Sequence, residues 1–191
     1  MKESRRSFLL PPPEEGLSAG LAFLRQARFR LREDYRVKIG GALAALSDEQ
    51  VWWRPNEASN SAGNLLLHLA GNVRQWVVAG VGGEPDRRDR PREFAERAPL
   101  ARAELLARLD AALSDADAAL ARLEEEVAEA ASDSPLQRVL LIQGFPQTAL
   151  DAVFHAVEHF SYHTGQIVCL AKWHAAGRVR FYDDRDLAGR S

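Results

Sequence analysis

The chain has 191 residues, and 46% of them are apolar, so it is long and apolar enough to form one domain with a buried core. Its formal net charge of −2 gives no general attraction to nucleic acid or to an anionic membrane, and we expect neither as a partner. The single cysteine, Cys169, excludes an internal disulfide, and no stretch of ~20 uncharged apolar residues predicts a membrane span, so we expect a cytoplasmic protein.

The N-terminal part of the sequence divides into an arm, a helix and a connector. Three consecutive prolines at residues 11–13 are incompatible with a helix, which predicts an extended arm over residues 1–16. Apolar residues then recur at spacings of three and four over residues 17–46, which predicts a helix. Residues 47–50 have the pattern of a capping box and predict a short helical turn. The connector that follows contains Trp52 and Trp53, which either pack over the end of the domain or line a pocket.

A second helix is predicted over residues 61–80, with serine and asparagine caps before it and glycines at its end. Residues 84–98 are charged and contain prolines, which predicts a loop. The run from Arg87 to Arg90 in this loop is either a solvated surface or a site for an anionic substrate.

The C-terminal half is predicted to contain two further helices. Residues 99–130 are rich in alanine, leucine and glutamate, which predicts a partly exposed helix. After a connection that includes an apolar run at residues 139–142, a fourth helix is predicted over residues 147–176. The remaining residues, 178–191, are a short tail, with an extended segment expected at 179–182.

Four long helices without a convincing sheet predict an all-α fold. We expect one helical bundle domain over residues 17–177, between the arm and the tail.

The fourth predicted helix contains His155, His159 and His163, each four residues after the last. Four residues rotate a side chain by only ~40° around a helix, so the three imidazoles lie on one face. Imidazoles spaced in this way can bind one divalent ion with nitrogen–metal distances of ~2.1 Å. A row of buried imidazoles is costly unless each nitrogen has a partner, so the alternatives are a metal site and a set of hydrogen-bonded core histidines.

The second predicted helix has a matching polar strip that contains Asn64, His68 and Asn72. A solvent-facing strip usually carries lysine and glutamate, and this one carries neither, which favours a cavity wall. If the two strips face each other, His68, His159 and His163 bind one ion and leave coordination positions open, as in catalytic sites. Zinc, nickel and iron all suit neutral imidazoles, and the sequence does not choose among them.

Three more polar residues of the fourth helix are candidates for the site. Tyr162 and Gln166 lie near the direction of His159 and are expected to position the ligands or the substrate. Glu158 completes an H-x-x-E-H pattern found in zinc peptidases, but a helical domain lacks the strand that aligns a peptide. Because Glu158 points ~100° away from His159, we expect it to form a salt bridge or to orient a ligand.

The string from His159 to Gln166, H-F-S-Y-H-T-G-Q, resembles the H-x-x-x-H-x-G-Q signature of the DinB-like superfamily. The segments 52–56 and 64–69 resemble the second-helix region of the same superfamily. With Arg88-Asp-Arg90 and Glu93-Phe94, the chain is similar to an uncharacterised subgroup of the DinB and YfiT-like metalloenzymes over roughly residues 20–175.

The resemblance implies a four-helix bundle of up-down-down-up topology that binds a divalent metal through His68, His159 and His163. It places His155 outside the ligands, and it implies a homodimer, since many relatives are dimeric. Characterised relatives use the metal to activate a low-molecular-weight thiol such as mycothiol, bacillithiol or glutathione, and they act as isomerases or S-transferases. Other relatives are known only as metal-binding proteins.

Together these observations predict a metal-dependent thiol S-transferase or isomerase that acts on a small electrophile with one zinc or nickel ion, or else iron. Asn64, Asn72, Tyr162 and Gln166 would position the substrate or the ligands. One alternative is a non-catalytic, stress-related metal-binding protein. The other is a metal-dependent hydrolase of small molecules, with Glu158 or Asp151 as the general base.

Overall fold

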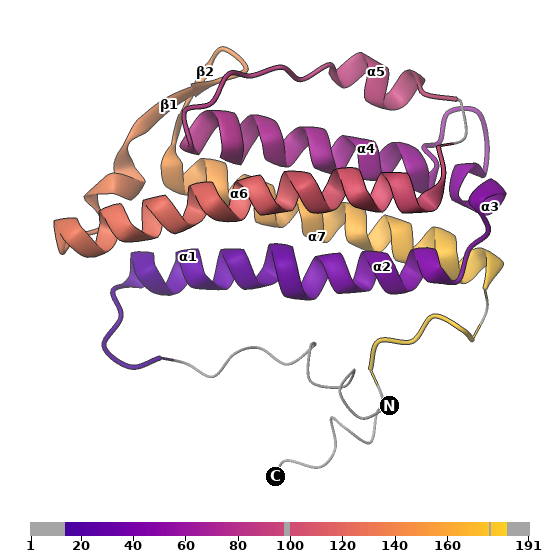
Figure 1. Cartoon of the computed structure of the whole chain (residues 1–191), viewed down its shortest axis with the longest axis horizontal. Coiled ribbons are helices and arrows are strands. Elements are labelled where there is room, and N and C mark those ends of the chain that lie inside the picture. The colour runs from indigo at the N-terminus through magenta and orange to yellow at the C-terminus, as the bar shows by residue number, and fades with distance from the viewer. Residues whose placement is uncertain (1–13, 98–99, 176, 183–191) are drawn as a thin grey trace, which may run out of the picture.

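The computed structural model of the chain describes residues 14–97, 100–175 and 177–182. This part of the protein is predominantly helical, in agreement with the predicted all-α class, and it contains one two-stranded hairpin. Four long helical segments lie along one another around a core of leucine, alanine, valine and isoleucine side chains (Figure 1). Within the same ranges, no helix combines the length and the apolar character needed to cross a membrane.

The first long segment consists of α1 (Ala19–Phe29), the π-helical segment η2 (Arg30–Tyr35) and α2 (Arg36–Ala44). They follow one another without a break and correspond to the helix predicted over residues 17–46. The short helix α3 (Asp48–Trp52) then begins with the predicted capping box, in which Ser47 and Gln50 each accept a hydrogen bond from the other's backbone nitrogen.

The second long segment consists of α4 (Ala62–Val73) and the π-helical segment η3 (Arg74–Val81), where the sequence predicts a helix over 61–80. Ser61 and Asn64 form a capping box at its start. The π-helical geometry of η3 changes the direction of the side chains after Val73, and π-helical turns are frequent at functional sites. A pattern based on 3.6 residues per turn does not reveal this change.

The predicted loop over 84–98 contains a helix, α5 (Arg90–Ala95), so that prediction is wrong for these six residues. The Asp89 side chain caps α5 by accepting a hydrogen bond from the Arg92 backbone nitrogen. Figure 1 shows α5 lying beside α4, and the amide of Asn64 holds the two together by donating to backbone carbonyls of α5 and the residue after it.

The third long helix, α6 (Arg102–Ala130), agrees with the helix predicted over 99–130 and ends in the left-handed residue Ala131. A single 3₁₀ turn, η4 (Ser134–Gln137), then leads into the hairpin.

The expectation of a protein without a sheet is corrected by strands β1 (Val139–Ile142) and β2 (Phe145–Thr148), which pair antiparallel. The apolar run at 139–142 forms the first strand. The two-residue turn between the strands consists of Gln143 and Gly144, both with positive φ angles, as tight hairpins require.

The fourth long helix, α7 (Ala149–His174), was predicted over 147–176. Thr148 and Asp151 form its capping box. Of the predicted arm, residues 1–13 lie outside the described residues, as do residues 183–191 of the predicted tail. Residues 179–182 form no strand, although Val179 is buried against the core.

Candidate metal centre

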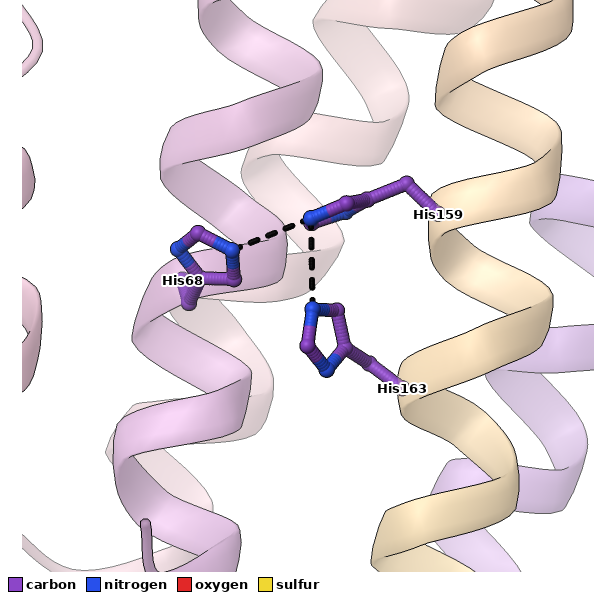
Figure 2. Close-up of side chains that lie close together, drawn as sticks. All are labelled: His68, His159 and His163. Carbon is purple, nitrogen blue, oxygen red and sulfur yellow. Dashed lines mark hydrogen bonds between the residues drawn. The ribbon is translucent and has the colours of Figure 1, made fainter. Parts of the chain in front are cut away.

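Three histidines from two helices meet between α4 and α7 (Figure 2). The Nε2 atom of His159 lies 3.0 Å from Nε2 of His68 and 3.2 Å from Nε2 of His163. His68 is buried, and the other two are half-buried. The structure therefore brings together the three histidines that the sequence places on two facing polar strips, and one nitrogen from each lies within 4.8 Å of the others.

In His68 and His163, a hydrogen bond at Nδ1 fixes the direction in which Nε2 of the same ring points. Nδ1 of His68 lies 2.8 Å from Oε2 of Glu93, and Nδ1 of His163 lies 2.7 Å from Oε1 of Gln166. Because both partners are acceptors, each Nδ1 carries the proton, and the lone pair of each Nε2 then points toward His159. Converging lone pairs repel one another unless a cation or a proton lies between them.

The spacing of the nitrogens fits a divalent ion. A tetrahedral ion with ligands at ~2.1 Å holds neighbouring nitrogens about 3.4 Å apart, close to the two distances observed. Three neutral imidazoles suit zinc, nickel or iron. The histidines present in this protein therefore fit a bound divalent metal.

His159 and His163 are held in the neutral form that binds metals. Burial, followed by the nearby His163 and His68, lowers the pKa of His159 to about 3. Burial also lowers the pKa of His163, although its hydrogen bond with Gln166 acts in the opposite direction. Nδ1 of His159 is buried and has no hydrogen-bond partner among the residues that the structure describes.

A buried ion pair between Arg88 and Glu93 contacts the Nδ1 side of the His68 ring. Arg88, whose side chain is only 3% exposed, donates from Nε to Oε1 of Glu93 at 2.8 Å and from Nη2 to Oε2 at 2.9 Å. Nη2 also lies 3.0 Å from Nδ1 of His68, but a guanidinium only donates, so a protonated Nδ1 bonds to Glu93. Burial alone would raise the pKa of Glu93, but the hydrogen bonds from Arg88 and His68 outweigh it and lower that pKa.

Sequence reasoning did not identify Glu93 or Arg88 as parts of the site. A carboxylate in a charged loop has no periodicity that distinguishes it from its neighbours, so Glu93 was noticed only as part of the family resemblance. Arg88 was noticed there and as part of the charged run from Arg87 to Arg90, with no link to the histidines. Gly71 on α4 makes the arrangement possible, since a Cβ atom at this position would collide with the Glu93 carboxylate.

A cavity of about 460 Å³ adjoins the histidines and is open to solvent. Its lining consists of His68, Asn72, Gln75, Trp76, Arg88, Arg90, Gln143, His155 and His159. A larger groove of about 1130 Å³ lies between α4, α6 and the segment 84–96, but none of the described residues that line it is a histidine. We therefore regard the smaller cavity as the one that serves the site.

His155 lies in this cavity but outside the converging group. Its Nε2 is 3.2 Å from Nδ2 of Asn72, and its ring packs against Trp76 with centroids 3.9 Å apart and planes tilted by 35°. Burial lowers the pKa of His155, against the opposite effect of Glu158. Glu158 itself is exposed.

Arg88 and Arg90 of the predicted charged loop line the cavity, whereas Asn64, Tyr162, Gln166 and the two tryptophans of the connector lie outside it. Asn64 is buried and joins α4 to α5. Tyr162 is 64% exposed, and its ring lies edge-on to His163 at 5.0 Å. Trp52 donates from Nε1 to the carbonyl of Leu100, and Trp53 stacks on an exposed tryptophan near the end of α7.

Comparison with known families places this site in context. No curated protein matches the chain. A family model described as "Protein of unknown function (DUF1572)" matches residues 18–181, which include all three converging histidines, and DUF1572 is a DinB-like family. The match spans most of the chain and agrees with the resemblance seen in the histidine motif at the level of the superfamily. The chain therefore belongs to the DUF1572 family.

Proposed function

We propose that this protein is a cytoplasmic, metal-dependent enzyme of the thiol S-transferase or isomerase type that acts on a small electrophile. His68, His159 and His163 would hold one divalent ion, with zinc or nickel as the first candidates and iron as the third. A divalent ion bound there would lower the pKa of a thiol ligand, so that the thiolate nucleophile is available near neutral pH. The convergence of three Nε2 atoms, with the rings of His68 and His163 oriented by hydrogen bonds at Nδ1, is the observation that carries this proposal.

The arrangement favours catalysis over a purely structural metal. Only three histidine, cysteine or carboxylate side chains converge in the described cluster, whereas structural zinc sites are closed by four protein ligands. Two of the three, His68 and His159, border the cavity, so a small molecule can reach them. Asn72 and Gln75 line the same cavity and would orient the substrate through their amides.

We also propose that the helices form the DinB-like four-helix bundle of up-down-down-up topology. The directions of the helices in Figure 1 support this, because α4 and α6 begin near α3 whereas α1 and α7 begin at the opposite end.

The homodimer implied by the family is part of the same proposal. Phe154 and Tyr162 on α7 are 57% and 64% exposed, and apolar side chains of this size are commonly covered at subunit interfaces. Light scattering on the purified chain would give twice the monomer mass for a dimer, and a monomer mass would refute this part of the proposal.

A metal-dependent hydrolase has weaker support. Such an enzyme needs a general base near the metal, and the carboxylate of Asp151 is used to cap α7. Glu158 is exposed, and none of the described residues that line the cavity is an aspartate or a glutamate. A non-catalytic, stress-related metal-binding protein remains the alternative that the experiment must distinguish.

The metal site is tested by elemental analysis of the full chain after loading and desalting. We expect about one divalent ion per chain, lost in His68→Ala, His159→Ala and His163→Ala. His174→Ala is the matched control, because this histidine lies at the end of α7, outside the converging group, and its variant should keep the metal. Retention of the ion in His68→Ala would refute a site shared by the two helices.

Catalysis is tested by incubating the metal-loaded protein with monochlorobimane and, in turn, mycothiol, bacillithiol and glutathione. Faster conjugate formation with at least one thiol, lost in His159→Ala, is expected. A protein that binds the metal but accelerates none of these reactions would support the non-catalytic alternative.

A further inference from the structure

The cavity beside the histidines is lined by groups that suit an anion. Its described lining contains two arginines, three side-chain amides, three histidines and a tryptophan, and it contains no carboxylate. Of the two arginines, Arg88 is neutralised by Glu93 at 2.8 Å. Arg90 is therefore the cation whose charge is available to a ligand.

Arg90 is held at the edge of the cavity without being neutralised. Its guanidinium carbon lies 5.1 Å from the centre of the Phe94 ring, and the Phe94 ring in turn lies 4.6 Å from the ring of His68. Such a cation–π contact restrains the side chain and leaves its hydrogen-bond donors free. Among the residues that the structure describes, no carboxylate forms an ion pair with Arg90.

Trp76 also lines the cavity. Nε1 of Trp76 is buried and has no hydrogen-bond partner within the described part of the chain. An indole N–H can only donate, but this atom is covered by protein, so Trp76 contributes its ring, and not a donor, to the cavity lining. The Gln143 amide donates to Gln75 at 2.6 Å, which fixes the turn of the hairpin against the same cavity.

We propose that this cavity recognises a ligand that carries a carboxylate, and that Arg90 is the residue that binds it. The inference rests on the proposed function, because it assigns this carboxylate to the small molecule that the three histidines and their metal would act on. When the ion is bound by neutral imidazoles its charge adds to that of Arg90, which strengthens the preference for an anion.

The test compares two thiols that differ only in their charged group. Isothermal titration calorimetry of the zinc-loaded full chain would measure binding of 3-mercaptopropionate and of 3-mercapto-1-propanol, with propionate as a probe that has no thiol. We expect 3-mercaptopropionate to bind about tenfold more tightly than the alcohol, since a charge-assisted hydrogen bond is worth roughly this factor. Arg90→Gln should remove the preference and leave the zinc content unchanged.

Arg87→Gln is the matched control, because Arg87 lies in the same segment but lines the larger groove instead of this cavity. It should preserve the preference for the carboxylate.

The outcomes separate this inference from the proposed function. Propionate binding that is lost in Arg90→Gln, without any thiol activity, would uphold the carboxylate site and refute the transferase. Thiol activity with equal affinity for the two thiols, or a preference that survives in Arg90→Gln, would overturn the carboxylate site alone. Failure of all three probes to bind the zinc-loaded protein would also overturn it.

Discussion

Oε2 of Glu93 lies 2.8 Å from Nδ1 of His68, so a carboxylate on a short surface helix sets the orientation of a histidine on the long helix beside it. The same carboxylate accepts two hydrogen bonds from Arg88, and the backbone carbonyl of Glu93 accepts one from Asn64. The position of the imidazole therefore depends on how firmly α5 is held against α4. Residues that never touch the ion should accordingly control its affinity.

Glu93→Gln tests this dependence directly. The amide removes the negative charge, so Arg88 loses its ion-pair partner and Nδ1 of His68 loses its charged acceptor. We expect the affinity for zinc to fall about 10- to 100-fold, measured by competition with a chromophoric chelator, while circular dichroism still reports a helical protein.

Glu84→Gln provides the control for this variant. Glu84 is exposed in the same segment and lines the larger groove, so its loss of charge should leave the affinity for zinc unchanged. Equal affinities in Glu93→Gln and the wild type would show that the carboxylate does not support the site.

Gly71→Ala should weaken metal binding without altering any ligand. A Cβ atom at this position would collide with the carboxylate of Glu93, which must then move away from His68. We expect a lower affinity for zinc in the same chelator competition, and the double variant with Glu93→Gln should be little worse than Glu93→Gln alone, because both act through one contact. Additive losses in the double variant would contradict this coupling.

The features that were predicted from the sequence are those that depend on local residue patterns along the chain. The first and fourth long helices follow from apolar residues that recur along the chain, α4 follows from the serine cap before it, and α6 follows from its alanine, leucine and glutamate content. The facing histidines follow from the same periodicity, because the positions of His159 and His163 on one face depend only on helical geometry.

The features that were missed depend on tertiary contacts. Helix α5 has only six residues, and it is held in place by Asn64 and by the ion pair between Arg88 and Glu93. The hairpin needs positive φ angles at Gln143 and Gly144, and the pair lacks the Asn-Gly or Asp-Gly sequence that usually indicates such a turn. The π-helical segment η3, which carries Gln75 and Trp76 into the cavity, has no sequence signature.

The metal-free protein should lose stability on acidification. In the folded state the pKa of His159 is lowered to about 3, mainly by burial, whereas in the unfolded chain it returns to about 6.5. The stabilisation from this neutral histidine is complete above pH 6.5 and is lost as the pH falls from there toward 3, since only the unfolded state takes up the proton. The lowered pKa values of His155 and His163 act in the same direction.

Urea denaturation in the presence of EDTA at pH 7.5 and pH 5 measures this effect. We expect a smaller free energy of unfolding at pH 5, and a weaker pH dependence in His159→Gln, which cannot take up the proton. A wild-type protein that is equally stable at the two pH values would be inconsistent with buried, neutral histidines.

Gly63, in the first turn of α4, lies against a rigid neighbour that any side chain at this position would meet. A Cβ atom there would lie 2.9–3.0 Å from ring atoms of Trp52, whose indole nitrogen is held by the carbonyl of Leu100. The ring must therefore shift and weaken that hydrogen bond, and Gly63→Ala should cost about 1–3 kcal/mol, as overpacking usually does. Gly165 on α7 is the matched control, because it is exposed and a Cβ atom would have no neighbour within 4 Å. Gly165→Ala should stabilise the helix by about 0.5–1 kcal/mol, so thermal denaturation should move the two midpoints in opposite directions, and two variants with equal midpoints would refute the steric argument.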